Sequence, residues 1–133
     1  MKKISIIIPC FNQGEFLDDC LGSLKKQTLQ NFEVILVNDG STETKTLEIL
    51  KSLEKKSSTT FPFQILHKKN EGLSSARNYG IKQATSDWIV PLDADDKLAP
   101  QYLEKTLNLA EENSLDFVAT QIQHFGLKKT VYK

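Results

Sequence analysis

The chain has 133 residues, of which 39% are hydrophobic and 26% are charged, a composition typical of one soluble globular domain with its own core. Its 17 basic and 17 acidic residues balance, so the overall charge favours neither nucleic acid nor an anionic membrane as a partner. No stretch approaches the length of a transmembrane helix, and the few residues before Pro9 are too short for the apolar region of a signal peptide. We therefore expect a cytoplasmic protein.

Short apolar runs alternate with stretches of helical periodicity along the chain. The apolar runs at residues 4–8, 32–37, 63–66 and 88–92 predict central strands that are buried on both faces, as parallel strands are. A fifth strand is predicted at residues 116–122. Apolar residues at helical spacing follow each of the first four runs, and Pro100 suits the first turn of the last helix. The alternation predicts an α/β fold with three α/β/α layers and a mostly parallel, Rossmann-like sheet.

Several shorter features carry structural expectations. Residues 12–15 resemble a helix start, with Asn12 three residues ahead of Glu15, and residues 55–60 form the chain's one polar, mobile loop. Cys10 and Cys20 lack C-x-x-C spacing and lie among apolar residues, so we expect reduced, buried thiols rather than a disulfide or a zinc site.

An acidic segment follows the fourth apolar run. Asp93, Asp95 and Asp96 lie within four positions, where carboxylates repel one another unless a cation or a proton relieves them. Hard divalent ions such as Mg²⁺ and Mn²⁺ prefer oxygen ligands of this kind. Two interpretations are equally supported at this stage: a metal site at the end of a strand, and an acidic loop that caps the helix beginning near Pro100.

Parallel strands end at one edge of a sheet, where open α/β folds bind ligands, so we expect the regions of Pro9, Asp39 and Asp93 to meet there. Neither glycine-rich phosphate loop, G-x-x-x-x-G-K-[ST] or G-x-G-x-x-G, occurs. A bound diphosphate would therefore need a metal at Asp93 and Asp95, helped by Arg77, the only arginine. A guanidinium matches phosphate oxygens in a way that lysine does not. The alternative for Arg77 is a surface ion pair with a nearby acid.

Other polar and aromatic residues have two interpretations each. Asp39 suits an acceptor for a base or ribose, or else an Asx-turn or helix cap. Phe11 suits stacking on a flat base, or else the core. Structural roles, such as capping for the two serines, are expected for His67, His124, Ser74 and Ser75.

Four segments in this order are similar to those of the family 2 glycosyltransferases, enzymes of the GT-A fold. They are residues 4–12, ending in Pro9-Cys10-Phe11-Asn12; residues 32–41, ending in Asn38-Asp39-Gly40-Ser41; residues 70–80, which contain Ala76-Arg77-Asn78-Tyr79-Gly80; and the Asp-x-Asp motif at Asp93-Ala94-Asp95-Asp96. The motif alone is weak, whereas four segments in register between residues 4 and 122 are specific.

The resemblance implies a fold of the nucleotide-diphospho-sugar transferase type and a role for each matching position. Asp39 would accept a hydrogen bond from the base, with uracil as the expected base, and Asp93 would lie by the ribose and the metal. Asp95 would ligate the Mn²⁺ or Mg²⁺ that bridges the diphosphate. The nucleotide-sugar-binding positions as a whole would be Pro9, Cys10, Phe11, Asn12, Asp39, Asn70, Arg77, Asp93 and Ala94, and the metal ligands would be Asp93 and Asp95.

The activity implied is inverting transfer of a sugar from a nucleotide-sugar, with a UDP-sugar as the expected donor, to a glycan or a lipid-linked acceptor. The alternative is a non-catalytic nucleotide-sugar-binding module. A sugar nucleotidyltransferase would carry a glycine- and lysine-rich loop after the first strand, and a response-regulator receiver would carry an acidic pair where this chain has Cys10 and Phe11.

The chain departs from the family pattern in three ways. Phe11 and Asn38 stand where Tyr and Asp are usual, although the stacking face and Asp39 remain. Family members also continue past this point to a downstream Asp or Glu that acts as general base, and no carboxylate side chain follows Asp116 here.

The missing carboxylate leads to an expectation about the catalytic base. We identify no catalytic residue within the chain and expect the general base to lie beyond Lys133, its last residue. Residues 1–133 would then be a single GT-A-like donor-binding domain that lacks the acceptor and base part. A longer form could also lie peripherally at the inner face of the membrane.

Overall fold

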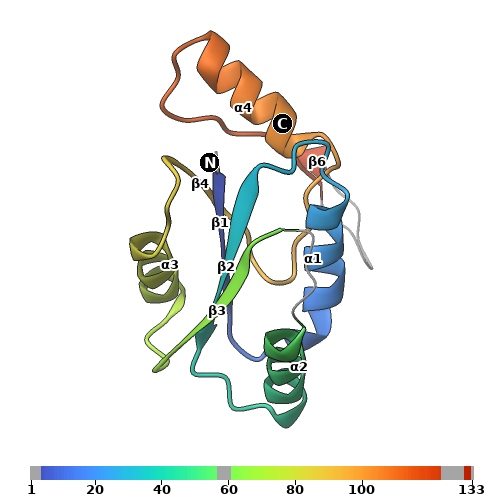
Figure 1. Ribbon diagram of the computed structural model, residues 1–133, viewed down its shortest axis with the longest axis vertical. Helices are drawn as coiled ribbons and strands as arrows, with labels where there is room; N and C mark the ends of the chain where they lie inside the picture. Colours follow the sequence, from blue (N-terminus) through green and yellow to red (C-terminus); the bar gives the residue numbers. More distant parts are fainter. Residues whose placement is uncertain (1–3, 57–60, 124–130, 133) are drawn as a thin grey trace.

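The computed structural model describes residues 4–56, 61–123 and 131–132. In chain order its elements are β1 (Ile4–Cys10), the short 3-10 helix η1 (Gly14–Phe16), α1 (Leu17–Lys25), β2 (Phe32–Asp39), α2 (Thr44–Lys55), β3 (Phe63–Lys68), α3 (Leu73–Lys82), β4 (Trp88–Pro91), α4 (Tyr102–Glu112), β5 (Ile122–Gln123) and β6 (Val131–Tyr132). Helices α1 and α2 lie on one side of the main sheet and α3 lies on the other (Figure 1). The predicted three-layer α/β/α architecture is therefore confirmed.

The main sheet consists of four parallel strands in the order β3-β2-β1-β4. Ile6 of β1 pairs with Val34 on one side and with Val90 on the other. Every residue of β1 and β2 is buried, as expected for parallel strands covered by helices on both faces. Strands are confirmed at residues 4–8, 32–37, 63–66 and 88–92, each with its ends within two residues of the prediction, but only β1 and β2 are central and buried. β3 and β4 form the two edges of the described sheet, and their residues are partly buried or exposed because each has a neighbouring strand on one side only.

Two apolar cores flank the sheet. In the larger core, Leu17 and Leu24 of α1 pack with Leu103 of α4, a helix that lies near the amino-terminal end of β1 (Figure 1). In the smaller core, Ala76 of α3 packs on Ile7 and its neighbours in β2. The small residues of α3 let its backbone approach the sheet closely. None of the described helices has the length and apolar character needed to cross a membrane.

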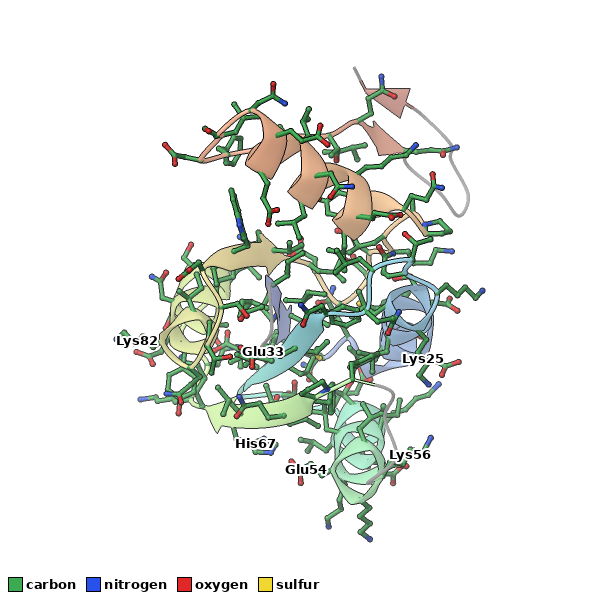
Figure 2. All side chains as sticks on the ribbon, turned by 45° about the horizontal axis from the view of Figure 1, so that its top comes forward. Lys25, Glu33, Glu54, Lys56, His67 and Lys82 are labelled. Carbon is green, nitrogen blue, oxygen red and sulfur yellow. The ribbon has the colours of Figure 1, made fainter. Side chains whose placement is uncertain are left out.

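Glu33 of β2 is a buried carboxylate that joins the sheet to the turn between α3 and β4 (Figure 2). Its Oε1 accepts hydrogen bonds from Ser5 Oγ at 2.6 Å, from Thr85 N at 2.7 Å and from Thr85 Oγ1 at 2.9 Å. These bonds offset the cost of burying a charge. They also fix the place where the chain enters β4, at the end of the sheet away from the acidic segment.

The strand predicted at residues 116–122 is wrong over residues 116–121. Only Ile122–Gln123 form β5, which pairs antiparallel with β6 in a separate two-stranded sheet. Phe117 is 80% exposed and Ile122 is 62% exposed, so these apolar side chains lie largely in solvent rather than against a packed layer. Strand formation depends on packing against neighbouring strands, and an apolar pattern alone does not supply it.

Two predicted helix starts are also corrected. Pro100 precedes α4, which begins at Tyr102 after a turn in which Tyr102 N donates to Ala99 O at 3.0 Å. Asn12 does not cap the helix that follows it, because η1 begins at Gly14 without a side-chain cap.

Three expectations concern residues that the structure does not describe. His124 and residues 57–60 of the expected mobile loop lie outside the described residues. Lys133, beyond which the general base is expected, also lies outside them. The position of the base therefore stays a prediction.

We expect Gly80→Ala to destabilise the protein. A Cβ at this position in α3 would lie 2.6 Å from Ile7 Cγ2 and 3.0 Å from Val37 Cγ2. Both methyl groups belong to buried β-branched side chains with little rotational freedom, and overpacking costs about 1–3 kcal/mol. Gly22→Ala in α1 is the matched control, because an added Cβ there would meet no neighbouring group within 4 Å. Its higher helix propensity should raise stability by up to about 1 kcal/mol. If urea unfolding shows the same increase in the free energy of unfolding for both variants, the close approach of α3 to the sheet is contradicted.

Candidate functional site

The predicted polar residues gather at the carboxyl-terminal edge of the main sheet. Cys10 ends β1, Asp39 ends β2, and the acidic segment follows β4. Because β1 lies between β2 and β4, these exits are neighbours in space. The expectation that the regions of Pro9, Asp39 and Asp93 meet at one edge is confirmed.

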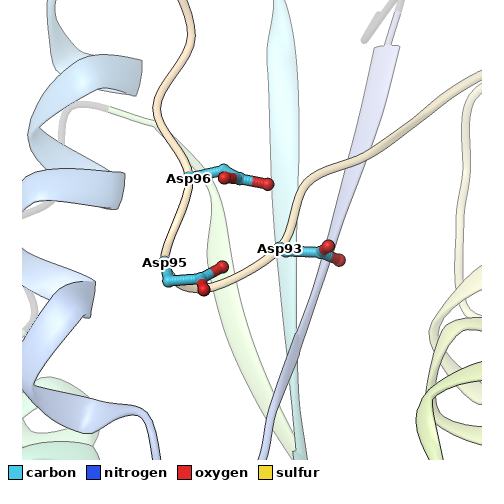
Figure 3. A group of neighbouring side chains, drawn as sticks. All are labelled: Asp93, Asp95 and Asp96. Atoms are coloured by element: carbon cyan, nitrogen blue, oxygen red, sulfur yellow. The ribbon is translucent and has the colours of Figure 1, made fainter. Parts of the chain in front are cut away.

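Asp93, Asp95 and Asp96 form a cluster of carboxylates on the loop after β4 (Figure 3). Each offers one oxygen, and these oxygens all lie within 4.8 Å of one another. An octahedral Mg²⁺ or Mn²⁺ holds its oxygen ligands at about 2.1 Å, which places them about 3–4 Å apart, so small side-chain rotations would bring these oxygens around one ion. Asp95 and Asp96 are exposed, whereas Ala94 between the acids is fully buried. The donor set and its access to solvent fit a hard divalent cation.

The second interpretation of this segment, an acidic cap for the last helix, does not hold. Gln101 is the N-cap residue of α4, and its side chain makes no capping hydrogen bond there. The acids lie several residues earlier, beyond the first turn in which a helix dipole favours negative charge. The carboxylates therefore do not cap α4.

Arg77 of α3 pairs with the first acid of this cluster. Its Nη2 donates to Asp93 Oδ1 at 2.7 Å, and the two side chains are 33% and 38% exposed. Its Nε is buried and has no hydrogen-bond partner among the described residues. The ion-pair interpretation of Arg77 is thus confirmed, and the pair lies at the sheet edge with an unsatisfied donor. Its role toward a diphosphate stays a prediction.

Asp39 is a second, very different carboxylate at this edge. It is 3% exposed, its Oδ1 accepts from Glu71 N at 3.1 Å, and its Oδ2 accepts from Gly72 N at 3.1 Å. Asp39 therefore holds the loop that enters α3. The N–H groups that it binds precede Leu73, the first residue of the helix, so it does not supply the cap expected of Ser74 and Ser75. No side chain caps the helix from its N-cap residue, Gly72.

The loops after β2 and β3 touch at a glycine. Gly40 has a φ of +69°, and a Cβ there would lie 2.5 Å from Asn70 N. Only glycine tolerates both the conformation and the contact. The Asn70 side chain is exposed beside this junction.

Lys68, at the end of β3, is a site residue that the sequence analysis missed. Its side chain is only 8% exposed, and its Nζ lies 3.3 Å from Asp39 Oδ1 and 3.0 Å from Glu71 Oε1. Loss of water acts to lower the pKa of Lys68, but hydrogen bonds to Glu71 and Asp39 outweigh it and raise the pKa above its ordinary value. A positive charge therefore accompanies Asp39. Its position at the end of a strand, on the same edge as Asp39, was the available signal.

Asn12 connects the exits of β1 and β2. Its Oδ1 accepts from Thr42 N and Glu43 N, each at 2.9 Å, and its backbone N donates to Ser41 Oγ at 3.1 Å. The residue has a φ of +52°, a conformation that asparagine adopts more readily than most residues. Asn12 thereby satisfies the backbone at the start of α2, the helix after β2 rather than the one after β1.

Asn38, which stands where the family usually has Asp, takes part in a second network. Its Oδ1 accepts from Ser41 N at 3.0 Å, and its Nδ2 lies 3.1 Å from His67 Nδ1. An amide NH₂ only donates, so His67 Nδ1 is the acceptor and Nε2 carries the proton toward Glu54 of α2 (Figure 2). His67 has the structural role expected for it.

The remaining predicted site residues differ in exposure. Phe11 is 44% exposed and is not a core residue, whereas Pro9, Cys10 and Ala94 are buried. Cys10 and Cys20 are free, buried thiols as expected. Burial raises the pKa of Cys10. Burial, together with the negative charges of Asp96 and Asp95, raises the pKa of Cys20 to about 12, so both thiols stay protonated.

The family model described as "Glycosyl transferase family 2" matches residues 5–133. An "Uncharacterized glycosyltransferase" of Rickettsia bellii is 42% identical over 121 residues, which is 91% of this chain and 17% of the relative. The "Uncharacterized glycosyltransferase EpsJ" of Bacillus subtilis is 40% identical over 115 residues, which is 86% of this chain and 32% of the relative. The chain thus spans less than a third of the length of either relative.

Solved structures show the same arrangement. S. aureus TarS 1–349 in complex with UDP-GlcNAc has a TM-score of 0.72 and 28% identity, over 84% of this chain and 32% of that one. The mannosyltransferase PcManGT from Pyrobaculum calidifontis, in complex with GDP-Man and Mn²⁺, has a TM-score of 0.63 and 20% identity, over 71% of this chain and 28% of that one. The second likeness concerns the fold alone.

We expect Asn12→Ala to lower the free energy of unfolding by about 1 kcal/mol, the usual net contribution of a hydrogen bond, because Thr42 N and Glu43 N lose their acceptor. Asn108→Ala removes the same amide from an exposed position in α4 and should leave stability unchanged or slightly higher. Urea unfolding measures both variants. The same stability for both would mean that the Asn12 amide does not hold the two exits together.

Proposed function

The chain belongs to glycosyltransferase family 2, whose model matches residues 5–133, and from this we propose that it binds a UDP-sugar at the carboxyl ends of β1, β2 and β4 for sugar transfer. The reaction would be an inverting transfer, assisted by Mn²⁺ or Mg²⁺, to a glycan or a lipid-linked acceptor. The GT-A fold expected for the family is confirmed by the sheet and by its structural neighbours. The uridine donor is supported by the structures of TarS in complex with UDP and with UDP-GlcNAc, at 28% identity to this chain.

The observation that carries the proposal is the contrast between two groups of carboxylates at one edge of the sheet. Asp39 is buried and held by two backbone N–H groups and Lys68. Asp95 and Asp96 face solvent beside Asp93 and its partner Arg77. A nucleoside diphosphate has a matching asymmetry, with hydrogen-bond donors on the base at one end and negative oxygens at the other.

The base and ribose would lie against the exits of β1 and β2. Phe11 would offer its exposed ring to one face of the base, and Pro9 and Cys10 would line the base and ribose pocket. Asp39 is an acceptor fixed in orientation, and it suits a ring N–H such as that of uracil. Asn12 would hold this pocket from the loop after β1, and Asn70 would border it from the loop after β3.

The diphosphate would lie by Asp93, Ala94 and Asp95. Three carboxylates repel a diphosphate, so this end of the site needs positive charge before a donor binds. A divalent ion held by Asp93 and Asp95 would supply Lewis-acid stabilisation of the leaving diphosphate. Arg77 would add guanidinium donors, including the Nε that has no partner among the described residues.

We expect UDP to bind more tightly with Mn²⁺ than without it, and Asp95→Asn to remove most of that difference. The loss should be at least about 10-fold in affinity, since even changes outside the first coordination shell act on that scale. Asp87→Asn is the matched control, because Asp87 is an exposed acid just before β4, at the opposite end of the same strand. Titration calorimetry measures all three proteins with and without Mn²⁺. Equal affinities throughout would mean that these carboxylates do not hold a metal.

We further expect residues 1–133 alone to show no acceptor-dependent sugar transfer, because the proposal places the general base beyond Lys133. The carboxylates beside the expected diphosphate are Asp93, Asp95 and Asp96, and a carboxylate that binds a cation is a poor proton acceptor. Lack of a general base costs about 10²–10⁴ in rate, and lack of acceptor positioning adds to this loss.

Release of nucleoside diphosphate from a panel of nucleotide-sugars with Mn²⁺, with and without glycan acceptors, is the assay for this expectation. Robust acceptor-dependent turnover would show that the base lies within these residues. Donor binding without turnover is the expected result, and it also suits a nucleotide-sugar-binding module.

A further inference from the structure

Helix α1 and the residues just after it present a buried polar face to the loop that carries the acids. Cys20, Ser23 and Gln27 are 0%, 8% and 4% exposed. Their spacing of three and four residues places the first two on one side of the helix, with Gln27 continuing the same line past its end. A helix normally buries an apolar stripe, and buried polar groups require hydrogen-bond partners. The hydrogen-bond partners of these three side chains indicate the structural role of this face.

All three side chains bond to the segment between β4 and α4. Cys20 Sγ lies 3.7 Å from Asp93 O, at the start of the segment. Ser23 Oγ accepts from Leu98 N at 3.1 Å, near its middle. Gln27 Nε2 donates to Ala99 O at 2.7 Å, and its Oε1 accepts from Leu103 N at 3.2 Å, in the first turn of α4. One line of side chains thus contacts the acidic loop at Asp93, Leu98 and Ala99 and then the first turn of α4.

These bonds replace the local structure that the loop lacks. Residues 92–101 contain no helix or strand, and α4 has no capping side chain of its own. Gln27, just after α1, provides that cap, because its Oε1 accepts one of the unpaired N–H groups at the start of α4. Asp93 O accepts from Asp96 N at 3.0 Å as well as from Cys20. With Ala94 buried beneath, the loop is held from the α1 side while Asp95 and Asp96 face solvent.

We propose that Ser23 and Gln27, with Cys20, are positioning residues for the metal at the Asp93–Asp96 loop: through backbone hydrogen bonds they set the spacing of carboxylates that they do not touch. The inference rests on the proposed function, because it requires that these carboxylates bind a divalent cation. Partners outside the coordination shell that orient ligands typically change metal affinity by 10–100-fold. The same scale is expected for removal of the Ser23 or Gln27 contact.

The test is Mn²⁺ binding to residues 1–133 in the absence of nucleotide, followed by the electron paramagnetic resonance signal of free Mn²⁺. Ser23→Ala and Gln27→Ala should weaken Mn²⁺ binding about 10–100-fold under conditions in which circular dichroism shows them folded. If Gln27→Ala does not fold, Gln27→Glu replaces it, because Glu keeps an acceptor for Leu103 N and loses the donor to Ala99 O.

Gln30→Ala is the matched control. Gln30 Nε2 bonds to Leu24 O and Gln27 O at the end of α1, and no described contact joins its side chain to the acidic loop. This variant should lose stability but keep its Mn²⁺ affinity within about two-fold of the wild type, far below the 10–100-fold expected of positioning residues.

The outcomes separate the inference from its premise. If wild-type protein binds Mn²⁺, Asp95→Asn abolishes binding, and Ser23→Ala and Gln27→Ala bind as the wild type does, the positioning role is overturned and the metal site stands. If Gln30→Ala loses affinity as much as Gln27→Ala, the effect is one of general stability and the inference is again overturned. Absence of Mn²⁺ binding by the wild type would overturn the proposed metal site and the inference together.

Discussion

The parallel pairing of β1 with β2 on one side and β4 on the other is the constraint on which the rest of this structure depends. After each parallel strand the chain must return to the edge of the sheet where the strand began, and it does so through helices, which cover both faces of the sheet. Every strand therefore ends at the same edge. The loops that follow the strands have no partners in the sheet, so their polar groups need other hydrogen-bond partners. These loops bond to one another: Asn12 bonds to the loop after β2, and Asp39 bonds to the loop after β3.

Because of these contacts, the carboxylates at the two ends of this edge differ in rigidity and in exposure to solvent. At the β2–β3 end, Asp39 has two backbone donors and Lys68, and almost no exposure, so it is rigid, and its Oδ2 can still accept one more hydrogen bond. At the β4 end, the acids lie on a loop without regular structure, and their charges are brought together rather than separated. A rigid acceptor suits selection of a base, whereas clustered, accessible carboxylates suit a cation. The two ends of one ligand can thus be recognised by different physical means.

The fold was predictable because its signals are local, whereas contacts between distant residues were not. The apolar runs of β1 and β2 directly reflect burial on both faces, but residues 116–121 share that pattern and lie largely exposed, so the same signal predicted a strand where the structure has none. Nothing near Asn12 in the sequence indicates that its amide serves the start of α2, some 30 positions later. Lys68 gains its role only when β3 lies beside β2. The buried polar face of α1 is likewise explained only by a loop that folds onto it more than 70 positions later.

We propose that one sheet edge holds a uridine diphosphate by Asp39 at one end and by metal-bound Asp93 and Asp95 at the other. A crystal structure of residues 1–133 with UDP and Mn²⁺, with data collected at the manganese absorption edge, tests it most directly. We expect an anomalous peak in contact with oxygens of Asp93 and Asp95 and of the diphosphate, and a hydrogen bond from the uracil ring N–H to Asp39. An anomalous peak away from these acids, or UDP bound elsewhere on the chain, would contradict it.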